Sequence, residues 1–464
     1  MRLNELRTPS YIVQEGALKH NLEILSSVSR ETGCKILLAQ KAFSMFRVYP
    51  MIAEYLDGTT ASGICEARLA HEEFRPGHRS DRIESDHTKI PATGVQDKTD
   101  ACKEFDACKE HDSCKAADAC KELDPCKGAD AACDKNCENH VFEPAYKTGE
   151  MKELCEICTH IYFNSLSQLE LHRPVWEPYQ KAGKIKVALR INPEFSTQEG
   201  HEIYDPCSRG SRLGIRKSLL PERLPEGVTG LHFHTLCEQN VQPLIDTFRH
   251  IEKEFAPYLE QAEWINMGGG HHITRDDYDV SALKGFLKET KDKYGFDIYL
   301  EPGEAVALNA GTLITTVMDV IDTEDHPTLI LDASAACHMP DVLEMPYTPP
   351  LLSVKRPVIK EGSSEYDMNV IYDSGASYDE KTGVRLASRT CLAGDVIGIY
   401  EMPSVPERGD VITFGDMAIY SMVKNNTFNG MLLPDIVLEH DTGDDDRFEI
   451  VKSFGYEDFK ERLS

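Results

Sequence analysis

The sequence predicts an α/β fold in which a (β/α)8 barrel is followed by a C-terminal all-β domain. Between Lys35 and Glu301, eight short apolar or β-branched runs each end at a polar residue or a glycine. Helical patterns separate most of these runs, as in Glu66–Phe74, Leu166–Gly183 and Val241–Leu259. After Gly303 the runs are separated by turns, with no long helix between most of them. Alternation of strands and helices indicates a barrel, and consecutive strands indicate a second, β-rich domain.

The eight runs are the expected barrel strands. In chain order they are Ile36–Ala39 before Lys41, Thr59–Ala61 before Ser62, Val141–Ala145 before Tyr146, Ile161–Phe163 before Asn164, Val187–Ile191 before Asn192, Val228–Phe233 before His234, Trp264–Met267 before Gly268, and Ile298–Leu300 before Glu301. Catalytic groups of this fold lie where the strands end. The residues that close the runs are therefore candidates for one active site.

The domain limits follow from the change of pattern. We expect the barrel to span residues 11–306 and the β domain to span residues 307–464 together with residues 1–10. A short segment, Pro9–Val13, is expected to join the second sheet. The other strands expected in that sheet are Thr312–Ile321, Thr328–Leu331, Met368–Tyr372, Asp395–Tyr400 and Asp410–Phe414.

A cysteine-rich repeat interrupts the barrel. Seven of the 15 cysteines lie between Cys102 and Cys137, in the run DACKEF, DACKEH, DSCKAA, DACKEL, DPCKGA and DAACDKNC. Charged residues crowd this segment and large apolar ones are few, so residues 77–139 are predicted to be a disordered low-complexity insertion. The spacing lacks the paired CxxC of a structural zinc site, although soft-metal binding by the thiols stays open. Cys155 and Cys158 lie in a helical pattern and are interpreted as core thiols.

Charge and composition narrow the class of protein. A formal net charge of −28 makes nucleic acid an unfavourable partner, because its phosphates would be repelled. General solubility accounts for a charge of this size, and the same charge would also concentrate a cationic substrate. The start of the chain has no apolar signal region, and no window of about 18 apolar residues suggests a membrane span. We expect a cytoplasmic enzyme that binds neither nucleic acid nor membrane.

Lys41 is the most informative strand-end residue. It follows the apolar run Lys35-Ile-Leu-Leu-Ala-Gln40 and precedes Ala-Phe-Ser. A lysine that loses hydration in a cleft has a lowered pKa and can form a Schiff base with a carbonyl group. Taken alone, the residue is better interpreted as an exposed lysine that closes a strand, which is the usual place for this residue type, so the rest of the chain must decide.

The whole pattern resembles the fold-type III pyridoxal-phosphate (PLP) enzymes, which include alanine racemase and the ornithine, arginine and diaminopimelate decarboxylases. The strings that carry the resemblance are LAQKAFS, LDGTTASGICEARL, HFHTLCEQN, NMGGGHHI, EPGEA, SRTCLAGDVIG and MVKNNTFNGM. The residues of these strings are most similar to those of decarboxylases that act on carboxynorspermidine and carboxyspermidine. The resemblance covers almost the whole chain apart from residues 77–139.

The resemblance implies a PLP site at the strand ends. Lys41 would hold the cofactor and be displaced by the substrate amine. His234 would stack on the pyridine ring and count among the catalytic residues. Glu301 would face the pyridine nitrogen, keep it protonated and border the substrate. A protonated ring accepts the electron pair released as CO2 departs.

The resemblance also implies how the phosphate is held. The three glycines Gly268, Gly269 and Gly270 would wrap it, because backbone N–H groups without a neighbouring Cβ can approach an anion closely. Tyr420 and Cys237 would lie beside the same phosphate. For Cys237 a buried structural thiol is an adequate alternative.

The second domain would complete the site of another subunit. In this family the segment that contains Cys391 and Asp395 crosses a dimer interface, so the resemblance implies a homodimer with active sites at the interface. Cys391 would be a catalytic proton donor to Cα, and Asp395 would bind an ammonium group of the substrate. A free core cysteine is the structural alternative for Cys391.

The expected reaction is PLP-dependent decarboxylation of carboxynorspermidine or carboxyspermidine, cationic carboxylated polyamines, to norspermidine or spermidine. Alternatives within the family are a diaminopimelate-type or arginine-type decarboxylase, or a racemase. A metal-dependent barrel hydrolase built on His232, His234, His271 and His272 would leave Lys41 without a role, so no metal is expected. A non-enzymatic alternative, a thiol-rich protein that buffers metal ions, would explain the cysteine repeat but not the polar residues at the strand ends. Arg212 stays open between a structural role and a place near the phosphate, and His271 has no assigned role. The residues His338, Asp341 and Glu344 stay open between flanking the polyamine arm of the substrate and lying in a solvated loop.

Overall fold

The structure, a computed structural model, describes residues 1–76, 137–198, 202–359, 366–442 and 447–464. The predicted low-complexity insertion and its thiol repeat fall almost wholly on residues 77–136, outside the described residues. The chain enters a strand at Glu138, so residues 138–139 belong to the barrel and not, as the sequence predicts, to the insertion. In the described ranges, no helix has the length and apolar character needed to cross a membrane.

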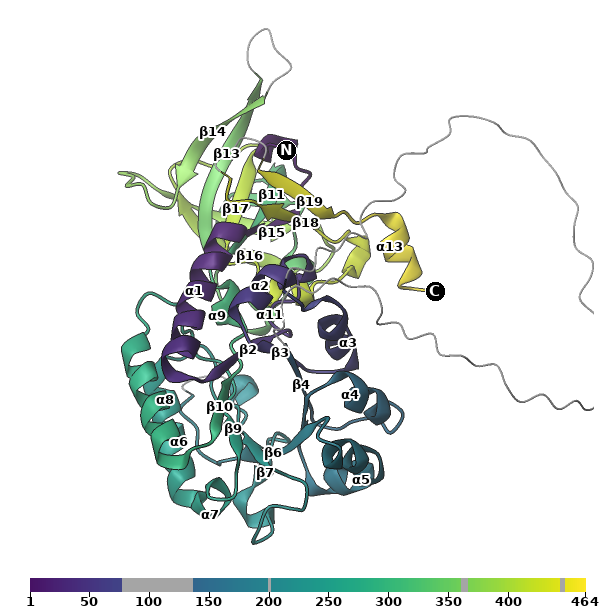
Figure 1. Ribbon diagram of the computed structural model, residues 1–464. Coiled ribbons are helices and arrows are strands. Elements are labelled where there is room, and N and C mark those ends of the chain that lie inside the picture. The colour runs from purple at the N-terminus through teal and green to yellow at the C-terminus, as the bar shows by residue number, and fades with distance from the viewer. Residues whose placement is uncertain (77–136, 199–201, 360–365, 443–446) are drawn as a thin grey trace, which may run out of the picture. The chain divides into compact units, whose positions relative to one another are not determined.

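Eight parallel strands close the predicted barrel (Figure 1). In chain order they are β2 (Lys35–Ala39), β3 (Gly58–Ala61), β4 (Glu138–Glu143), β5 (His160–Phe163), β6 (Lys186–Asn192), β8 (Gly230–His232), β9 (Trp264–Asn266) and β10 (Asp297–Leu300). Strand β6 pairs with both β5 and β8, and β10 pairs with β2 to complete the ring. A short strand, β7 (Ile215–Arg216), pairs with β6 outside this ring.

Helices follow the strands along the chain (Figure 1). Their bounds are α1 (Glu15–Thr32), α2 (Tyr49–Tyr55), α3 (Ile64–Glu73), α4 (Met151–Ile157), α5 (Leu166–Lys181), α6 (Val241–Glu254), α7 (Ala256–Leu259), α8 (Val280–Tyr294) and α9 (Glu304–Ala307). Side chains cap two of the longer ones at their N-termini: the hydroxyl of Ser165 accepts from the N–H of Gln168 at α5, and Oδ1 of Asn240 accepts from the N–H of Val241 at α6. Such caps satisfy backbone donors that a helix start leaves without partners.

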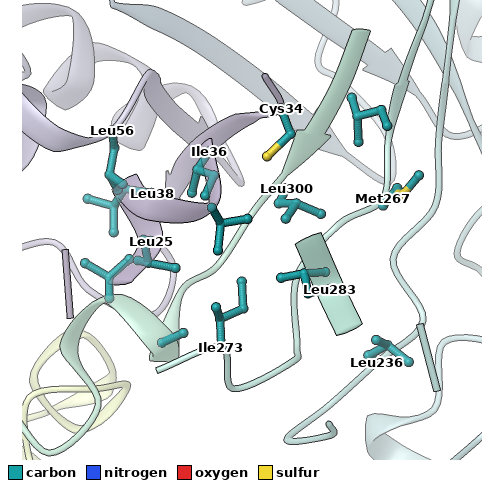
Figure 2. Packing of buried hydrophobic residues seen from close by; sticks show 14 of the residues in the cluster. Leu25, Cys34, Ile36, Leu38, Leu56, Leu236, Met267, Ile273, Leu283 and Leu300 are labelled. Carbon is teal, nitrogen blue, oxygen red and sulfur yellow. The ribbon is translucent and has the colours of Figure 1, made fainter. Parts of the chain in front are cut away.

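Alternate residues of the barrel strands face two different environments. Ile36 and Leu38 of β2 pack with Leu25 of α1 and Leu283 of α8 in the layer between strands and helices (Figure 2). Leu37, which lies between them, joins a separate cluster inside the ring, whose other members are Tyr162, Ala188, Trp264 and Tyr299. This alternation is the period of two expected of a strand. It aims every second side chain of a strand into the barrel.

The second domain is a mixed sheet that includes the N-terminal strand. Its strands are β1 (Ser10–Gln14), β11 (Gly311–Ile321), β12 (Thr328–Leu331), β13 (Leu351–Ile359), β14 (Tyr366–Asp373), β15 (Thr382–Ser388), β16 (Val396–Met402), β17 (Val411–Gly415), β18 (Asp435–Glu439) and β19 (Phe448–Lys452). Strand β1 pairs antiparallel with β11 and parallel with β18. The N-terminal segment therefore joins this sheet, as predicted, although it extends to Gln14 and not only to residue 10. Four short helices complete the domain: α10 (Ala335–His338), α11 (Asp341–Glu344), α12 (Ser421–Lys424) and α13 (Tyr456–Glu461).

Two kinds of difference separate the predicted strands from the observed ones. Strand β4 ends at Glu143, whereas the sequence predicts Val141–Ala145. Pro144 stops the strand because it has no N–H to donate to a neighbouring strand. Strands β13, β15, β18 and β19 are not predicted at all, and they hold their places by pairing with distant parts of the chain.

Candidate active site

A cavity of about 400 Å³ lies where the predicted strand-end residues meet. Lys41, His234, Gly270 and Glu301 line it, and they follow β2, β8, β9 and β10 respectively. A smaller pocket of about 50 Å³ shares Lys41, His234 and Glu301 and is also lined by Ser62. Strands far apart in the sequence thus deliver their terminal residues to one place, as the barrel prediction requires.

Three other strand-end residues do not line these cavities. The hydroxyl of Tyr146 donates to the backbone carbonyl of Val141, 3.0 Å away. Asn164 accepts from the N–H of Gly214 at 2.6 Å, and Asn192 donates to the carbonyl of Leu213 at 3.0 Å. These side chains hold loops in place at the carboxyl ends of their strands.

Lys41 has the properties of a nucleophilic amine. Its side chain is exposed where it borders the cavity, yet protein surrounds the site closely. This surrounding protein disfavours the charged form, and the positive charge of Arg190 adds to the effect, so the pKa of Lys41 is lowered. A lowered pKa leaves more of the amine neutral near pH 7, and the neutral amine is the form that attacks a carbonyl.

His234 presents a neutral aromatic ring to the cavity. Burial and the charges of Lys41 and Arg190 lower its pKa well below the ordinary value. The Nδ1 atom accepts a hydrogen bond from the N–H of Gly269 at 3.0 Å, which assigns the ring proton to Nε2. A fixed, uncharged ring of this kind suits stacking on a planar cofactor.

Glu301 is buried and charged. Its Oε1 accepts from Nδ2 of Asn266 at 2.7 Å, and its Oε2 lies 3.4 Å from Nε2 of His232. Burial alone would raise the pKa of this carboxyl, but His232 and further polar neighbours outweigh it and lower the pKa to about 2. A carboxylate held in this way can keep a bound pyridinium nitrogen protonated.

The three glycines after β9 are not equivalent. Gly268 and Gly270 have φ of +71° and +83°, and a Cβ on Gly270 would lie 1.9 Å from the carbonyl oxygen of Leu236. The N–H of Gly268 donates to Oδ1 of Asn266 at 2.8 Å, and that of Gly269 donates to His234. Among the described residues the N–H of Gly270 has no acceptor, and Gly270 alone of the three lines the cavity. The third glycine is therefore the one that can offer its N–H to an anion.

Cys237 and Tyr420 add neutral donors beside Gly270. Both line the cavity. Burial raises the pKa of the Cys237 thiol to about 12, with further contributions from nearby carboxylates, and burial also raises the pKa of the Tyr420 hydroxyl. The N–H of Tyr420 donates to the carbonyl of Ala42 at 2.9 Å, so this β-domain residue is fixed against the loop that follows Lys41. Both side chains keep their protons and can donate to a phosphate.

Arg190 is a site residue that the sequence reasoning missed. It lies in β6, is buried and lines both cavities. Its guanidinium donates to the carbonyl of His234 at 3.1 Å and lies 4.4 Å from the ring centre of Phe142. Burial lowers its pKa to about 10, so it stays charged at neutral pH. The sequence does hold a signal for this residue, because an arginine inside an apolar strand is a buried charge that needs a partner.

Acidic side chains also border the cavity, and the sequence reasoning did not find them. They are Glu202, Asp205 and Glu304. Glu304 contacts Nε2 of His272 at 2.6 Å. Arg212, whose role the sequence left open, lines the cavity as well.

Cys391 and Asp395 lie in the β domain and do not line the cavity of their own chain. Cys391 is exposed, and its N–H donates to Oδ1 of Asn429 at 2.7 Å. Asp395 is buried, and its carboxylate accepts from the hydroxyls of Ser334 and Thr390, both at 2.6 Å. Their contacts with substrate remain predictions.

The other residues whose roles the sequence leaves open have their partners in the β domain. His338 is buried, and its Nε2 donates to the carbonyl of Leu432 at 3.0 Å. Asp341 and Glu344 both bind the ammonium group of Lys424. None of the three borders the cavity of about 400 Å³.

The histidines of the metal-hydrolase alternative do not form a ligand group. Among the described residues, the set of three metal-ligating side chains that lie close enough together is Glu138, His140 and His160, and it includes neither His232 nor His234. His271 instead contacts the hydroxyl of Tyr278 through Nδ1, at 2.7 Å.

Comparison with known proteins agrees with this geometry. A family model described as pyridoxal-dependent decarboxylase, C-terminal sheet domain, matches residues 25–418. The carboxynorspermidine/carboxyspermidine decarboxylase of Campylobacter jejuni is 33% identical over 463 residues, which cover 100% of both chains. The carboxyaminopropylagmatine decarboxylase of Synechocystis sp. is 32% identical over 466 residues, covering 100% of this chain and 97% of that protein.

Solved structures agree as well. The crystal structure of carboxynorspermidine decarboxylase from Campylobacter jejuni, complexed with norspermidine, is 32% identical with a TM-score of 0.74, covering 98% of this chain and 100% of that one. Diaminopimelate decarboxylase from Helicobacter pylori, at 13% identity and a TM-score of 0.68 over 99% of this chain and 97% of that one, shares the fold.

The chain therefore belongs to the pyridoxal-dependent decarboxylases. Within that class it is a carboxy-lyase of the carboxynorspermidine decarboxylase type, an enzyme of polyamine biosynthesis that uses PLP. The site fits that cofactor: it combines a lysine of lowered pKa, an ionised buried glutamate, and a glycine N–H beside two protonated donors.

Proposed function

We propose that this enzyme decarboxylates carboxynorspermidine or carboxyspermidine and releases norspermidine or spermidine. The observation that carries the proposal is the composition of the cavity: the groups suited to PLP share it with the carboxylates Glu202, Asp205 and Glu304. A polyamine carries several ammonium groups, and carboxylates at the wall of a cavity favour such a ligand. The relative from Campylobacter jejuni supports the same substrates.

The residues suited to PLP each have a proposed role. Lys41 binds the cofactor covalently, His234 orients its ring, and Glu301 keeps the proton on the ring nitrogen. Gly270, with Cys237 and Tyr420, binds the phosphate. When bound, PLP supplies an electron sink for the electron pair left on Cα by the departing CO2.

A second substrate has nearly equal support. The relative that acts on carboxyaminopropylagmatine is 32% identical, against 33% for the carboxynorspermidine-type relative. The two substrate types differ at the far end of the chain, where a guanidinium replaces an ammonium, and carboxylates can bind both groups.

A substrate panel separates these possibilities. We expect the purified PLP-loaded enzyme to release CO2 from carboxynorspermidine or carboxyspermidine with the highest kcat/KM, measured with carboxyaminopropylagmatine in parallel and diaminopimelate as control. Mass spectrometry of the amine product identifies the reaction. Preference for carboxyaminopropylagmatine would favour the second candidate, and preference for diaminopimelate would refute both.

We further infer that the enzyme works as a homodimer. Cys391 belongs to a family motif but is exposed and stands outside the cavity of its own chain, which suggests that it serves the site of a second subunit. Most soluble homo-oligomers are two-fold dimers, so each subunit would lend its Cys391 to the other.

Cys391→Ala is expected to lower kcat by roughly 10²-fold, because general acids contribute about that much. A mixed dimer tests the shared site directly. When the Lys41→Ala and Cys391→Ala subunits are co-expressed, random pairing should restore about a quarter of wild-type activity, since half of the dimers would carry one intact site. Recovery no greater than the separate variants give would show that each site uses a single chain.

A further inference from the structure

A chain of hydrogen bonds runs from Glu301 into the barrel. Nδ2 of Asn266 donates to Oε1 of Glu301 at 2.7 Å and to the hydroxyl of Tyr162 at 2.7 Å. Tyr162 contacts Nδ1 of His140 at 2.5 Å, and Nε2 of His140 contacts Glu138 at 2.9 Å. Glu138 finally binds the ammonium group of Lys35. The groups come from β2, β4, β5, β9 and the end of β10, with Glu138 and His140 both on β4, and they meet inside the ring.

Chemistry fixes the direction of every bond in this chain. An amide nitrogen can only donate, so Asn266 gives one hydrogen to Glu301 and the other to Tyr162. At the other end the carboxylate of Glu138 can only accept, so the neutral ring of His140 carries its proton on Nε2 and donates it to Glu138. Nδ1 of His140 is then an acceptor, and the phenol proton of Tyr162 goes to it. Because Asn266 cannot take up a proton, the chain does not conduct protons and can act only by holding its members in place.

The members of the chain are deeply buried. Asn266, His140 and Tyr162 are each 0% exposed, so water cannot replace a missing partner. Hydrogen bonds in such surroundings are strong when complete and costly when one partner is lost. Burial also lowers the pKa of His140, which keeps the ring neutral and the donor pattern unchanged near pH 7.

Asn266 links this chain to the cofactor side of the site. Its Oδ1 accepts from the N–H of Gly268 at 2.8 Å, while its Nδ2 serves Glu301 and Tyr162. The oxygen and the nitrogen of the Asn266 amide are thus both fixed, by three hydrogen-bond partners in all. The orientation of the glycine turn and that of the Glu301 carboxylate depend on the same side chain.

We propose that Asn266, Tyr162, His140 and Glu138 form a positioning network that holds the carboxylate of Glu301 toward the ring nitrogen of the cofactor. The proposal rests on the proposed role of Glu301. It extends the functional part of the barrel to a buried layer that touches neither cofactor nor substrate.

A metal site on the same residues is the main alternative. Glu138, His140 and His160 lie close enough together to hold an ion. However, Glu138 already binds the ammonium group of Lys35, and both ring nitrogens of His140 have hydrogen-bond partners. An ion would have to break the network, so the observed contacts favour the positioning role.

Tyr162→Phe tests the network with one lost hydroxyl. We expect the variant to fold, to bind PLP roughly tenfold more weakly, and to show a changed 15N chemical shift of the ring nitrogen in 15N-labelled PLP. Tyr299→Phe is the matched control. Tyr299 lies in the same interior cluster, and its hydroxyl is 3.2 Å from Lys35 and 3.5 Å from His160, at the end of the chain farthest from Glu301. Thermal unfolding of both apoproteins measures the cost of losing a buried hydroxyl.

The outcomes separate this proposal from the role of Glu301 itself. If Tyr162→Phe matches Tyr299→Phe in PLP affinity and 15N shift while Glu301→Gln changes both, the network proposal fails and the role of Glu301 stands. If Glu301→Gln also changes neither, the role of Glu301 fails. Should Tyr162→Phe not fold, Glu138→Gln at the half-buried end is expected to weaken PLP binding about threefold, and an unchanged affinity there would overturn the network.

Discussion

Lys41→Ala is expected to lower kcat/KM by roughly 10³-fold or more, because no other described lysine borders the cavity and a covalent anchor has no substitute there. Borohydride reduction of the PLP-loaded wild type should attach one pyridoxyl group, which peptide mass spectrometry would locate at Lys41. The alanine variant should carry no such label.

Lys41→Arg is the matched variant, because it keeps a positive charge at the position. A guanidinium stays protonated at any physiological pH and cannot act as the nucleophile, so this variant should be as inactive as alanine. Retention of most of the activity by either variant, together with a borohydride-sensitive yellow colour, would contradict the assignment.

The lowered pKa of Lys41 has a consequence for cofactor capture. Only the neutral amine reacts, so the rate at which the apoprotein takes up PLP should rise with pH and level off above the pKa of Lys41. Because that pKa is below the ordinary 10.5, the plateau should begin at a lower pH than for an exposed lysine. Stopped-flow absorbance across pH measures it, and a rate that still rises up to pH 10.5 would contradict the lowered pKa.

The barrel could be predicted because its strands are short, apolar and regularly spaced. All eight predicted runs overlap observed strands, and β2 and β10 differ from the prediction by a single residue at the start. Such runs are buried on both faces by the ring and the helices, so hydrophobicity alone reveals them. The second sheet is different: β15 contains Gly383 and Arg385, and only its pairing with β12 and β16 makes it a strand.

The site could be predicted in part. Lys41, His234 and Glu301 could be predicted because each follows an apolar strand and each has a side chain suited to catalysis. Arg190 lies inside a strand, where sequence does not tell which face lines the cavity. The hydrogen-bond network that ends at Glu301 was not predicted either. Glu138 adjoins the cysteine repeat, so its polar side chain was assigned to the insertion. A polar barrel interior is a property of the closed ring and not of any single strand.

Glu301→Gln is expected to lower kcat by roughly 10²–10³-fold, the usual cost of losing one preorganised charged group from an active site. Glutamine keeps the shape of the side chain but not its charge. It could still accept from Asn266 through its oxygen, and its amide would then present a neutral donor where the wild type presents a carboxylate. A ring nitrogen without an anionic partner loses its proton more easily and accepts the electron pair less well.

Steady-state kinetics, with the 15N shift of labelled PLP, measures this loss. The matched control is Glu260→Gln, which removes the same charge at an exposed position just after α7. We expect the control to keep wild-type kcat and the wild-type shift. A Glu301→Gln variant with kcat within a few-fold of the control would show that the glutamate does not set the charge of the ring.

Acid unfolding tests independently whether the carboxylate of Glu301 is held in its charged form. The pKa of Glu301 is lowered from 4.5 to about 2 in the folded protein, so its ionised form stabilises the fold above pH 4.5. That contribution disappears as the pH falls from 4.5 toward 2, because the unfolded chain takes up the proton in this interval while the folded protein still resists it. The wild type should therefore lose more unfolding free energy than Glu301→Gln over this interval, whereas Glu260→Gln should follow the wild type. Parallel curves for all three proteins would mean that the carboxylate is not held in its charged state by the surrounding barrel.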